Sequence, residues 1–273
     1  MALLKLAAVQ AALIFLIKPA TTQKAYDLIQ LAGQNGANVI GFPEASYPLL
    51  PDADPLKTSL YVWLFDNALE VLGPEVSALQ DACKQANIFG VVGINERIAD
   101  TTGTLYNTQI TMGSDEHLLH KHQKYVPTTG SKTTAQMDFG ALGGLICAEN
   151  GNPLGQYATA LDCPVVHVAS WLQFPSFGVE VNNLIKSAGR AVAFSVGEYV
   201  INSASVVRNA EKRRRAVIFG SGGSVVAGST QNGSSEEILY ADVDLEAVKV
   251  YKHTFDYAGH HQRQEIFAPL FQE

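Results

Sequence analysis

Three chemically reactive side chains stand at the ends of strand-like segments of this 273-residue chain. Glu44 follows the apolar run that ends in Gly-Phe-Pro, Lys124 ends the segment HLLHKHQK, and Cys147 ends the segment GGLI. Catalytic groups in α/β proteins gather where strands lead into loops, so a carboxylate, an amine and a thiol at such ends can meet in one pocket. The carboxylate can then accept a proton from the thiol and return it to a leaving amine.

Each of these side chains also has a simpler interpretation when it is considered alone. A cysteine in an apolar strand is usually a core residue, a lysine at a strand end is usually solvated, and a glutamate after proline is usually a turn residue. A free thiol has a pKa of about 8.5 to 9 and is mostly protonated at neutral pH. If the three meet, we expect the charge of Lys124 and the helix after Pro153 to lower the pKa of Cys147.

The hydrophobic pattern predicts strands and helices that alternate along the chain. Apolar residues recur three and four positions apart between Ala25 and Ala32, which predicts a helix with Thr22 as its N-cap and Gly33 at its end. A second helix would place Cys83 on its apolar face. Such alternation, with some strands adjacent in sequence, predicts a layered α/β fold with a mixed sheet. Further helices are predicted at 154–161 and 181–194, and strands at 4–9, 37–42, 88–94, 105–112, 116–125, 143–147, 165–169, 199–207, 216–227 and 238–243.

Composition narrows the class of protein. With 47% hydrophobic and 16% charged residues, 273 residues suffice for one well-packed core and are short for two domains, so one domain is expected over residues 1–273. The net charge of -7 argues against a nucleic-acid partner, and the basic run 211–215 is best interpreted as a solvated turn between strands. Three cysteines without a CxxC pair favour a reducing compartment, so we expect a cytoplasmic protein. The N-terminal segment 1–17 is apolar enough to mimic a signal peptide, but Lys5 and Gln10 interrupt it and no clean cleavage site follows, so we do not expect a signal peptide. The segment is also too short for a membrane span.

Histidines and glycines offer two weaker signals. His117, His120 and His122 suggest a metal cluster, but on a strand only the last two share a face, so we expect no metal site. The glycines of FGSGG, residues 219–223, are followed by neither Lys-Ser/Thr nor a helix pattern, so a strand bend is expected there rather than a phosphate loop. Cys163, before Pro164, is expected to be a packing residue at a helix-to-strand corner.

Three segments, in this order, resemble the signature segments of the nitrilase family: GFPEA at 41–45, HKHQKYVPT at 120–128 and GGLICAEN at 143–150. Further similarity runs through HVASW at 167–171, FGSGGSVVAG at 219–228, ILYADVDLEAV at 238–248 and YAGHHQRQEIF at 257–267, so the resemblance covers nearly the whole chain. It implies an α/β fold of the four-layer-forming α-β-β-α sandwich type with mixed sheets. It also implies a single carbon–nitrogen hydrolase domain whose tail, about 250–273, is used in assembly.

The resemblance implies a role for each candidate. Cys147 would be the nucleophile on a tight elbow, Glu44 the general base, and Lys124 the group that stabilises negative charge on the attacked substrate. The N–H of Ala148 would be a second donor, and Glu149 would line the same site. A nitrile attacked at carbon would give a thioimidate, lose ammonia after water adds, and leave a thioester that is hydrolysed to the acid. Neither a metal nor an organic cofactor is needed for these steps.

Four features depart from the family pattern. Ser131 and Lys132 stand where Glu-Arg is usual, within a short loop, and Ala148 stands where Trp is usual. Ser195 occupies a position that is usually Glu, and the segment AALIFLIKPATT at 11–22 is unusually apolar. Because the usual glutamate near 131 is thought to position the lysine, its absence predicts a working nucleophile with slow turnover.

The leading hypothesis is therefore a nitrilase, a hydrolase of carbon–nitrogen bonds other than peptide bonds. An amidase of the same superfamily would share Glu44, Lys124 and Cys147, and a catalytically impaired, self-assembling homologue is a third interpretation. We expect a small-molecule nitrile or amide substrate, no nucleic-acid or membrane partner, and a homodimer or a larger spiral homo-oligomer.

Overall fold

The computed structural model describes residues 3–45, 56–99, 103–124, 134–172, 181–206, 216–229 and 235–267. Within these ranges the strands form one 12-stranded mixed sheet in the order β5-β4-β3-β2-β1-β9-β8-β7-β6, with β12 beside β1 and the β10–β11 hairpin beside β9. The strands are β1 (Leu3–Ala11), β2 (Val39–Gly41), β3 (Phe89–Glu96), β4 (Tyr106–Met112), β5 (Leu118–Gln123), β6 (Thr134–Met137), β7 (Gly140–Ile146), β8 (Pro164–Trp171), β9 (Tyr199–Ser205), β10 (Val217–Phe219), β11 (Val225–Gly228) and β12 (Glu237–Asp244).

The sheet consists of two halves that face each other. They join edge to edge over only two residue pairs, Gln10 with Ala204 and Ala11 with Ser205. Away from this seam the halves stack, as the contacts of β4 with β7 and of β2 with β8 show. An apolar core fills the space between them, and it includes Leu6, Val168 and Ile201, each of which is fully buried.

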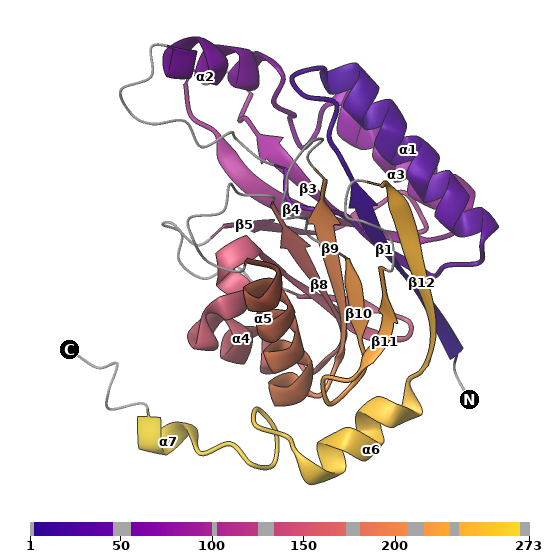
Figure 1. Cartoon of the computed structure of the whole chain (residues 1–273), viewed down its shortest axis with the longest axis vertical. Coiled ribbons are helices and arrows are strands. Elements are labelled where there is room, and N and C mark those ends of the chain that lie inside the picture. Colours follow the sequence, from indigo (N-terminus) through magenta and orange to yellow (C-terminus); the bar gives the residue numbers. More distant parts are fainter. Residues whose placement is uncertain are drawn as a thin grey trace.

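Helices cover the outer faces of both halves (Figure 1). α1 (Lys18–Gln34) and α3 (Pro74–Ala86) pack against each other over the β1–β4 half, through a second core cluster. α4 (Pro153–Ala160) and α5 (Val181–Val196) lie over the β7–β9 half, through a third. The layers therefore follow the order α-β-β-α, and the predicted fold class is confirmed. α2 (Leu56–Asp66), α6 (Glu246–Thr254) and α7 (Gln264–Phe267) complete the helices in the described ranges.

α3 illustrates why these sequences fold as they do. Pro74 opens the helix, where its missing N–H costs nothing, and Asn87 closes it in the left-handed conformation. Its buried side chains include Val76, Leu79 and Cys83, which recur three and four positions apart. The predicted helix with Cys83 on its apolar face is confirmed.

Several predicted details were wrong. α1 begins at Lys18 with Pro19 in its first turn, so Thr22 is not the N-cap, and its hydroxyl donates instead to the carbonyl of Lys18. The helix ends at Gln34, one residue beyond Gly33. Cys163 is exposed rather than packed.

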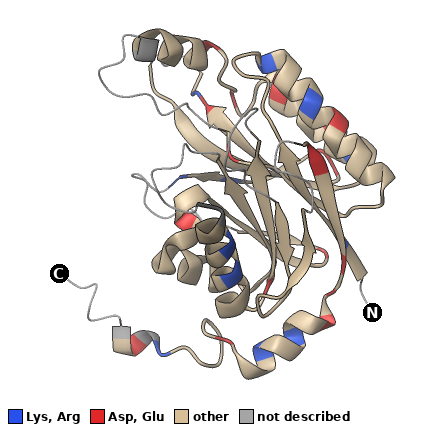
Figure 2. Cartoon of the chain, viewed as in Figure 1, with Lys and Arg blue, Asp and Glu red and all other residues tan. Residues whose placement is uncertain are grey.

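The predicted strand 216–227 is two strands, β10 and β11, because Gly222 and Gly223 take positive φ and turn the chain. β10 runs antiparallel to β9, and the basic run 211–215 between them lies outside the described residues. Charges of both signs are interspersed on the outer helices, as α1 and α6 show (Figure 2). Among the described residues, no helix has the length and hydropathy needed to cross a membrane.

Candidate active site

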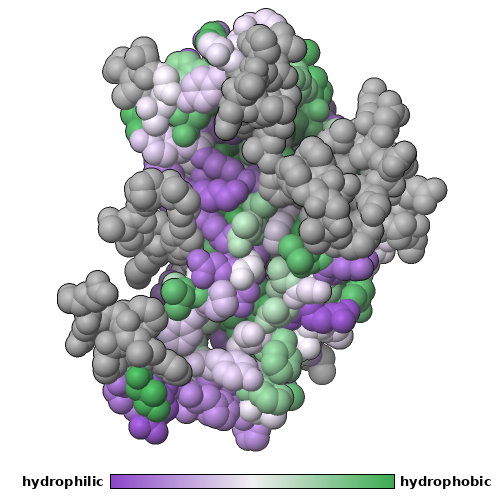
Figure 3. Space-filling model, turned by 60° about the vertical axis from the view of Figure 1, so that its left-hand side comes forward, coloured by the Kyte–Doolittle hydropathy of each residue, from purple (hydrophilic) through white to green (hydrophobic). Residues whose placement is uncertain are grey.

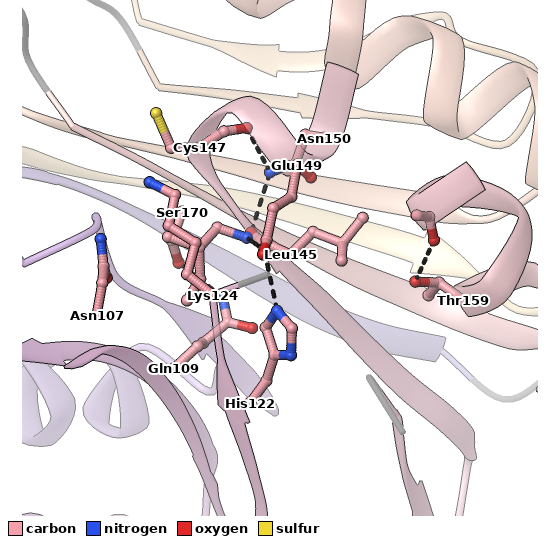
Figure 4. Close-up of polar contacts among 12 residues, drawn as sticks. Asn107, Gln109, His122, Lys124, Leu145, Cys147, Glu149, Asn150, Thr159 and Ser170 are labelled. Carbon is pink, nitrogen blue, oxygen red and sulfur yellow. Dashed lines mark hydrogen bonds and ion pairs between the residues drawn. The ribbon is translucent and has the colours of Figure 1, made fainter. Parts of the chain in front are cut away.

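Cys147 lies at the point where β7 ends and a short 3-10 turn, Cys147–Gly151, begins. Its backbone takes φ 52°, a left-handed conformation that non-glycine residues rarely adopt and that is frequent at functional sites. The Asn150 amide donates to the carbonyls of Leu145 and Cys147 at 3.0 and 3.1 Å, which braces the turn from within. Figure 4 shows the sulfur of Cys147 directed away from this brace.

Glu44 and Lys124 form an ion pair beside the turn. Lys124 Nζ lies 2.7 Å from Glu44 Oε1, and the glutamate side chain is only 1% exposed, against 30% for the lysine. Asn107 on β4 joins the pair in two ways, because its side-chain amide donates to the same Oε1 and its backbone carbonyl accepts from the N–H of Lys124. Glu44 Oε2 has no hydrogen-bond partner among the described residues. One carboxylate oxygen is thus held in place while the other remains available.

The pKa of the Cys147 thiol is raised to about 12. Burial is the largest cause, because a thiolate loses its hydration there, and the negative charge of Glu44 acts in the same direction. Lys124 and the N–H of Ala148 favour the thiolate, but their effect is smaller. The expectation that Lys124 would give Cys147 a low pKa was therefore wrong: burial and the Glu44 carboxylate outweigh the lysine, and the resting thiol is protonated.

The two residues that follow Cys147 face different surroundings. The N–H of Ala148 favours the thiolate form of Cys147, whereas the side chain of Ala148 is exposed. The carboxylate of Glu149 is buried and accepts from the N–H of Ile146 at 2.8 Å and from His122 Nε2 at 2.9 Å. Glu149 therefore stabilises the turn from below (Figure 4), and the carboxylate that contacts Lys124 is that of Glu44. A role for Glu149 in lining the reaction space stays a prediction.

Hydrogen bonds between the stacked halves fix the end of β2, which carries Glu44. Gln109 on β4 donates to Ser170 Oγ on β8 at 2.8 Å, and Ser170 donates onward to the carbonyl of Phe42 at 2.8 Å. Ser203 on β9 donates to the carbonyl of Gly41 at 2.7 Å. Gly144 leaves room for the side chain of Gln109 to reach Ser170, since a Cβ at position 144 would lie 2.1 Å from Gln109 Oε1. The strand end that precedes Glu44 is thus held by hydrogen bonds from β8 and β9.

The remaining predicted positions lie elsewhere or outside the described residues. His122 is buried on β5 against Glu149, and the described ranges contain no group of three side chains that could hold a metal ion. Ser131 and Lys132 fall within 125–133, which is not described. Ser195 lies near the end of α5 and is partly buried.

Two positioning amides, Asn107 and Asn150, were missed by reasoning from sequence. Alternation along YNTQITM did carry a signal for the first, since Asn107 and Gln109 must share one face of β4. Nothing in the spacing identified Asn150, because its partners are backbone carbonyls of its own turn.

Comparison with known proteins identifies the family. The carbon–nitrogen hydrolase family model matches residues 5–253. The chain belongs to this family. It is 30% identical to an aliphatic nitrilase from Rhodococcus rhodochrous over 308 residues, which cover 98% of this chain and 82% of that protein. It is 31% identical to a nitrilase from Bacillus sp. (strain OxB-1) over 294 residues, which cover 94% of this chain and 84% of that protein.

Solved structures share the fold of this carbon–nitrogen hydrolase. Saccharomyces cerevisiae Nit3, described as a member of branch 10 of the nitrilase superfamily, matches with a TM-score of 0.76 at 20% identity, over 96% of this chain and 97% of its own. A carbon–nitrogen hydrolase from Helicobacter pylori G27 matches with a TM-score of 0.77 at 15% identity, over 100% and 99%. The resemblance seen in the three sequence segments is therefore confirmed, and the chain is a hydrolase of the nitrilase superfamily with the α-β-β-α fold of that superfamily.

Proposed function

We propose that this carbon–nitrogen hydrolase is a nitrilase that converts a small nitrile to a carboxylic acid and ammonia through a covalent intermediate on Cys147. The observation that carries the proposal is a buried thiol on a left-handed elbow that feels the charges of both a carboxylate and an amine, with the amine paired to that same carboxylate. The similarity to nitrilases along nearly the whole chain supports a nitrile as the substrate.

Glu44 starts the reaction as a general base. Because the thiol is protonated at rest, its proton must leave during attack, and Glu44 accepts it as the sulfur bonds to the nitrile carbon. The carbon–nitrogen π bond that breaks places its electron pair on nitrogen, which takes up that proton to give the thioimidate. Lys124 and the N–H of Ala148 stabilise the negative charge that builds up on nitrogen.

Two water molecules complete the reaction. Glu44 removes a proton from the first water as it adds to the thioimidate carbon and passes that proton to the nitrogen, which gives a tetrahedral adduct with a hydroxyl and an amine. Glu44 then moves the hydroxyl proton to the amine as the carbon–nitrogen bond breaks, so that ammonia leaves and a thioester remains. The second water adds to the thioester carbon in the same way, and the carbon–sulfur bond breaks to release the acid and restore the thiol. One nitrile and two waters thus give one acid and one ammonia.

The test combines product analysis with intact-protein mass spectrometry. Aliphatic, aromatic and arylaceto nitriles and their matching amides are each assayed for ammonia and acid, with Cys147→Ser and the exposed-cysteine control Cys163→Ser in parallel. A nitrilase releases ammonia from a nitrile, and a covalent adduct maps to Cys147. Ammonia from the amides alone would make the protein an amidase, and no adduct with any compound would support the impaired, self-assembling homologue.

We also infer that the protein self-associates through the face made by α4 and α5. Large apolar side chains on this face are exposed, namely Leu154 at 59%, Leu161 at 43%, Leu184 at 61% and Phe194 at 41%. Figure 3, which shows the molecule from the left-hand side of Figure 1, has hydrophobic residues (green) interspersed with hydrophilic ones (purple) on this surface. Light scattering should show a dimer or larger species that Leu184→Lys dissociates, whereas Leu31→Lys on α1 leaves it intact. A wild-type monomer of 29.3 kDa would refute self-association. Assembly through the tail at about 250–273 stays a prediction.

A further inference from the structure

A line of buried polar side chains runs beneath the turn that carries Cys147. His167 on β8 and Glu198 at the start of β9 are both fully buried, and the proposed catalytic steps use neither. His167 Nε2 lies 2.8 Å from Asn150 Oδ1, and His167 Nδ1 lies 3.6 Å from Glu198 Oε1. The line therefore leads from Glu198 through His167 and Asn150 to the carbonyl of Cys147.

The orientation of the Asn150 amide determines which nitrogen of His167 carries the proton. Asn150 Nδ2 faces two carbonyl oxygens, those of Leu145 and Cys147, and only the amine end of the amide can donate to them. The oxygen end must then face His167, and it can only accept. His167 Nε2 is consequently the protonated nitrogen, and Nδ1 carries a lone pair.

That lone pair faces a carboxyl group with no other partner. Neither His167 Nδ1 nor either oxygen of Glu198 has a hydrogen-bond partner in the described ranges. An unprotonated ring nitrogen and an ionised carboxylate are both acceptors, so facing each other away from water they would both remain unsatisfied. One proton between them satisfies both groups, and the 3.6 Å separation is just beyond normal hydrogen-bond reach.

Burial determines where this proton resides. It raises the pKa of Glu198 well above its ordinary value, and Lys252 on α6 opposes that shift only in part. It also lowers the pKa of His167 to about 3, with the nearby His122 acting in the same direction. Both groups are therefore uncharged, and the proton belongs to the Glu198 carboxyl.

We propose that Glu198 is a positioning residue for Cys147. As an uncharged acid it donates to His167 Nδ1, which keeps His167 in the Nε2–H form and holds the Asn150 amide on the carbonyls of Leu145 and Cys147. Without that donor the imidazole can bind its proton at Nδ1, and its bare Nε2 would then face the oxygen of Asn150. The turn that keeps Cys147 at φ 52° would lose its brace. The effect on turnover rests on the proposed role of Cys147 as the nucleophile.

Two substitutions of similar size separate donation from simple packing. Glu198→Gln keeps an N–H that can donate to His167 Nδ1, whereas Glu198→Met removes the donor. We expect Glu198→Met to lower kcat by about tenfold at an unchanged KM, because a displaced nucleophile weakens the transition state rather than substrate binding. Glu198→Gln should retain kcat, and the rate at which iodoacetamide alkylates Cys147 should follow the same order. Val243→Ala, in the inner core, is the control for lost stability alone.

The proposal is overturned if Glu198→Gln is impaired as much as Glu198→Met, or if Glu198→Met leaves both kcat and alkylation unchanged. Nitrogen-15 NMR of the histidine rings in the wild-type protein gives a second test, which requires neither a variant nor a substrate. His167 should appear as the neutral ring protonated at Nε2 at neutral pH. A ring protonated at Nδ1, or at both nitrogens, would overturn the proposal. An intact Nε2–H form in a protein that releases no ammonia from nitriles would contradict the proposed function alone.

Discussion

Two buried cysteines in this protein have thiols with the same raised pKa, but one lies among apolar side chains and the other beside charged ones. Cys83 and Cys147 are 0% and 1% exposed, and burial is the largest reason that the pKa of each thiol is raised from 9.0 to about 12. Cys83 lies on α3 in an apolar cluster, against Gly90 of β3. Cys147 lies on a left-handed turn beside a glutamate, a lysine and a backbone N–H.

The comparison shows that a low thiol pKa does not distinguish the candidate nucleophile in this fold. In the proposed mechanism, what distinguishes it is a base within reach, since Glu44 would accept the proton at the moment of attack. Cys83 lies in an apolar cluster, where the backbone of Gly90 is its polar neighbour in the described ranges. On that mechanism, reactivity depends on the contacts that hold Glu44, Lys124 and Asn107 in place.

The largest expected effect comes from exchanging sulfur for oxygen at each cysteine. Cys147→Ser should abolish ammonia release, since a hydroxyl is far harder to deprotonate than a thiol and Glu44 is too weak a base for it. Cys83→Ser should lower the free energy of unfolding by about 1–3 kcal/mol by burying a hydroxyl, yet leave kcat within a factor of about two. Steady-state kinetics and urea unfolding of both variants measure this difference. Turnover by Cys147→Ser would contradict the covalent mechanism.

Glu44→Gln should separate acidity from reactivity. Removing the carboxylate removes a charge that raises the pKa of Cys147, so that pKa should fall below about 12. Turnover should nevertheless fall by about a hundredfold to ten-thousandfold, because no base remains to accept the proton. Rates of iodoacetamide alkylation against pH report the pKa, and ammonia release reports turnover. Glu96→Gln, at a buried carboxylate bound by Lys121, is the matched control. If Glu44→Gln had both a lower pKa of Cys147 and faster ammonia release than wild type, Glu44 would not be the base.

Asn107→Leu should have an intermediate effect. It removes the amide that holds Glu44 Oε1 but leaves the ion pair with Lys124 in place. We expect kcat to fall by about tenfold, which corresponds to about 1.4 kcal/mol of transition-state stabilisation. Thr111→Val, on the same strand but away from Glu44, should not change kcat. Unchanged kinetics in Asn107→Leu would show that Lys124 alone suffices to orient the carboxylate.

Sequence reasoning predicted the elements better than the environment of the site. Strand ends are marked by an abrupt change from apolar to polar residues, so Glu44, Lys124 and Cys147 were placed correctly at the ends of β2, β5 and β7. That their side chains come together followed from the resemblance of the three segments, because spacing along the chain cannot show which strands become neighbours in a sheet.

What sequence reasoning missed depends on three-dimensional packing. The sign of the Cys147 pKa shift follows from burial, which one sequence position does not reveal, and it outweighs the charge of Lys124. The brace by Asn150 depends on carbonyls in its own turn, and the facing of His167 and Glu198 depends on two strands being adjacent. The start of α1 was placed after Thr22, because threonine is a common N-cap. Pro19 was the better signal, since proline is favoured in the first turn of a helix, and α1 begins at Lys18.

The smallest expected effect is an alkaline loss of stability caused by Cys83. Its folded-state pKa of about 12 lies above its ordinary value of 9.0, so above 9.0 the unfolded chain releases a proton that the folded chain retains. Unfolding is therefore favoured as pH rises from 9.0 toward 12, and the contribution is absent below 9.0. At half a pH unit above 9.0 the loss is about 0.8 kcal/mol. Cys83→Val lacks the thiol and therefore escapes this loss. The free energy of unfolding of Cys83→Val minus that of wild type, both measured in urea, should increase by about 0.8 kcal/mol between about pH 8 and pH 9.5. Taking the difference from wild type removes the contributions of lysine and tyrosine, which titrate alike in both proteins. Parallel curves for the two proteins would mean that Cys83 ionises as easily in the fold as in water, and the equality of the two cysteines on which the comparison rests would fail.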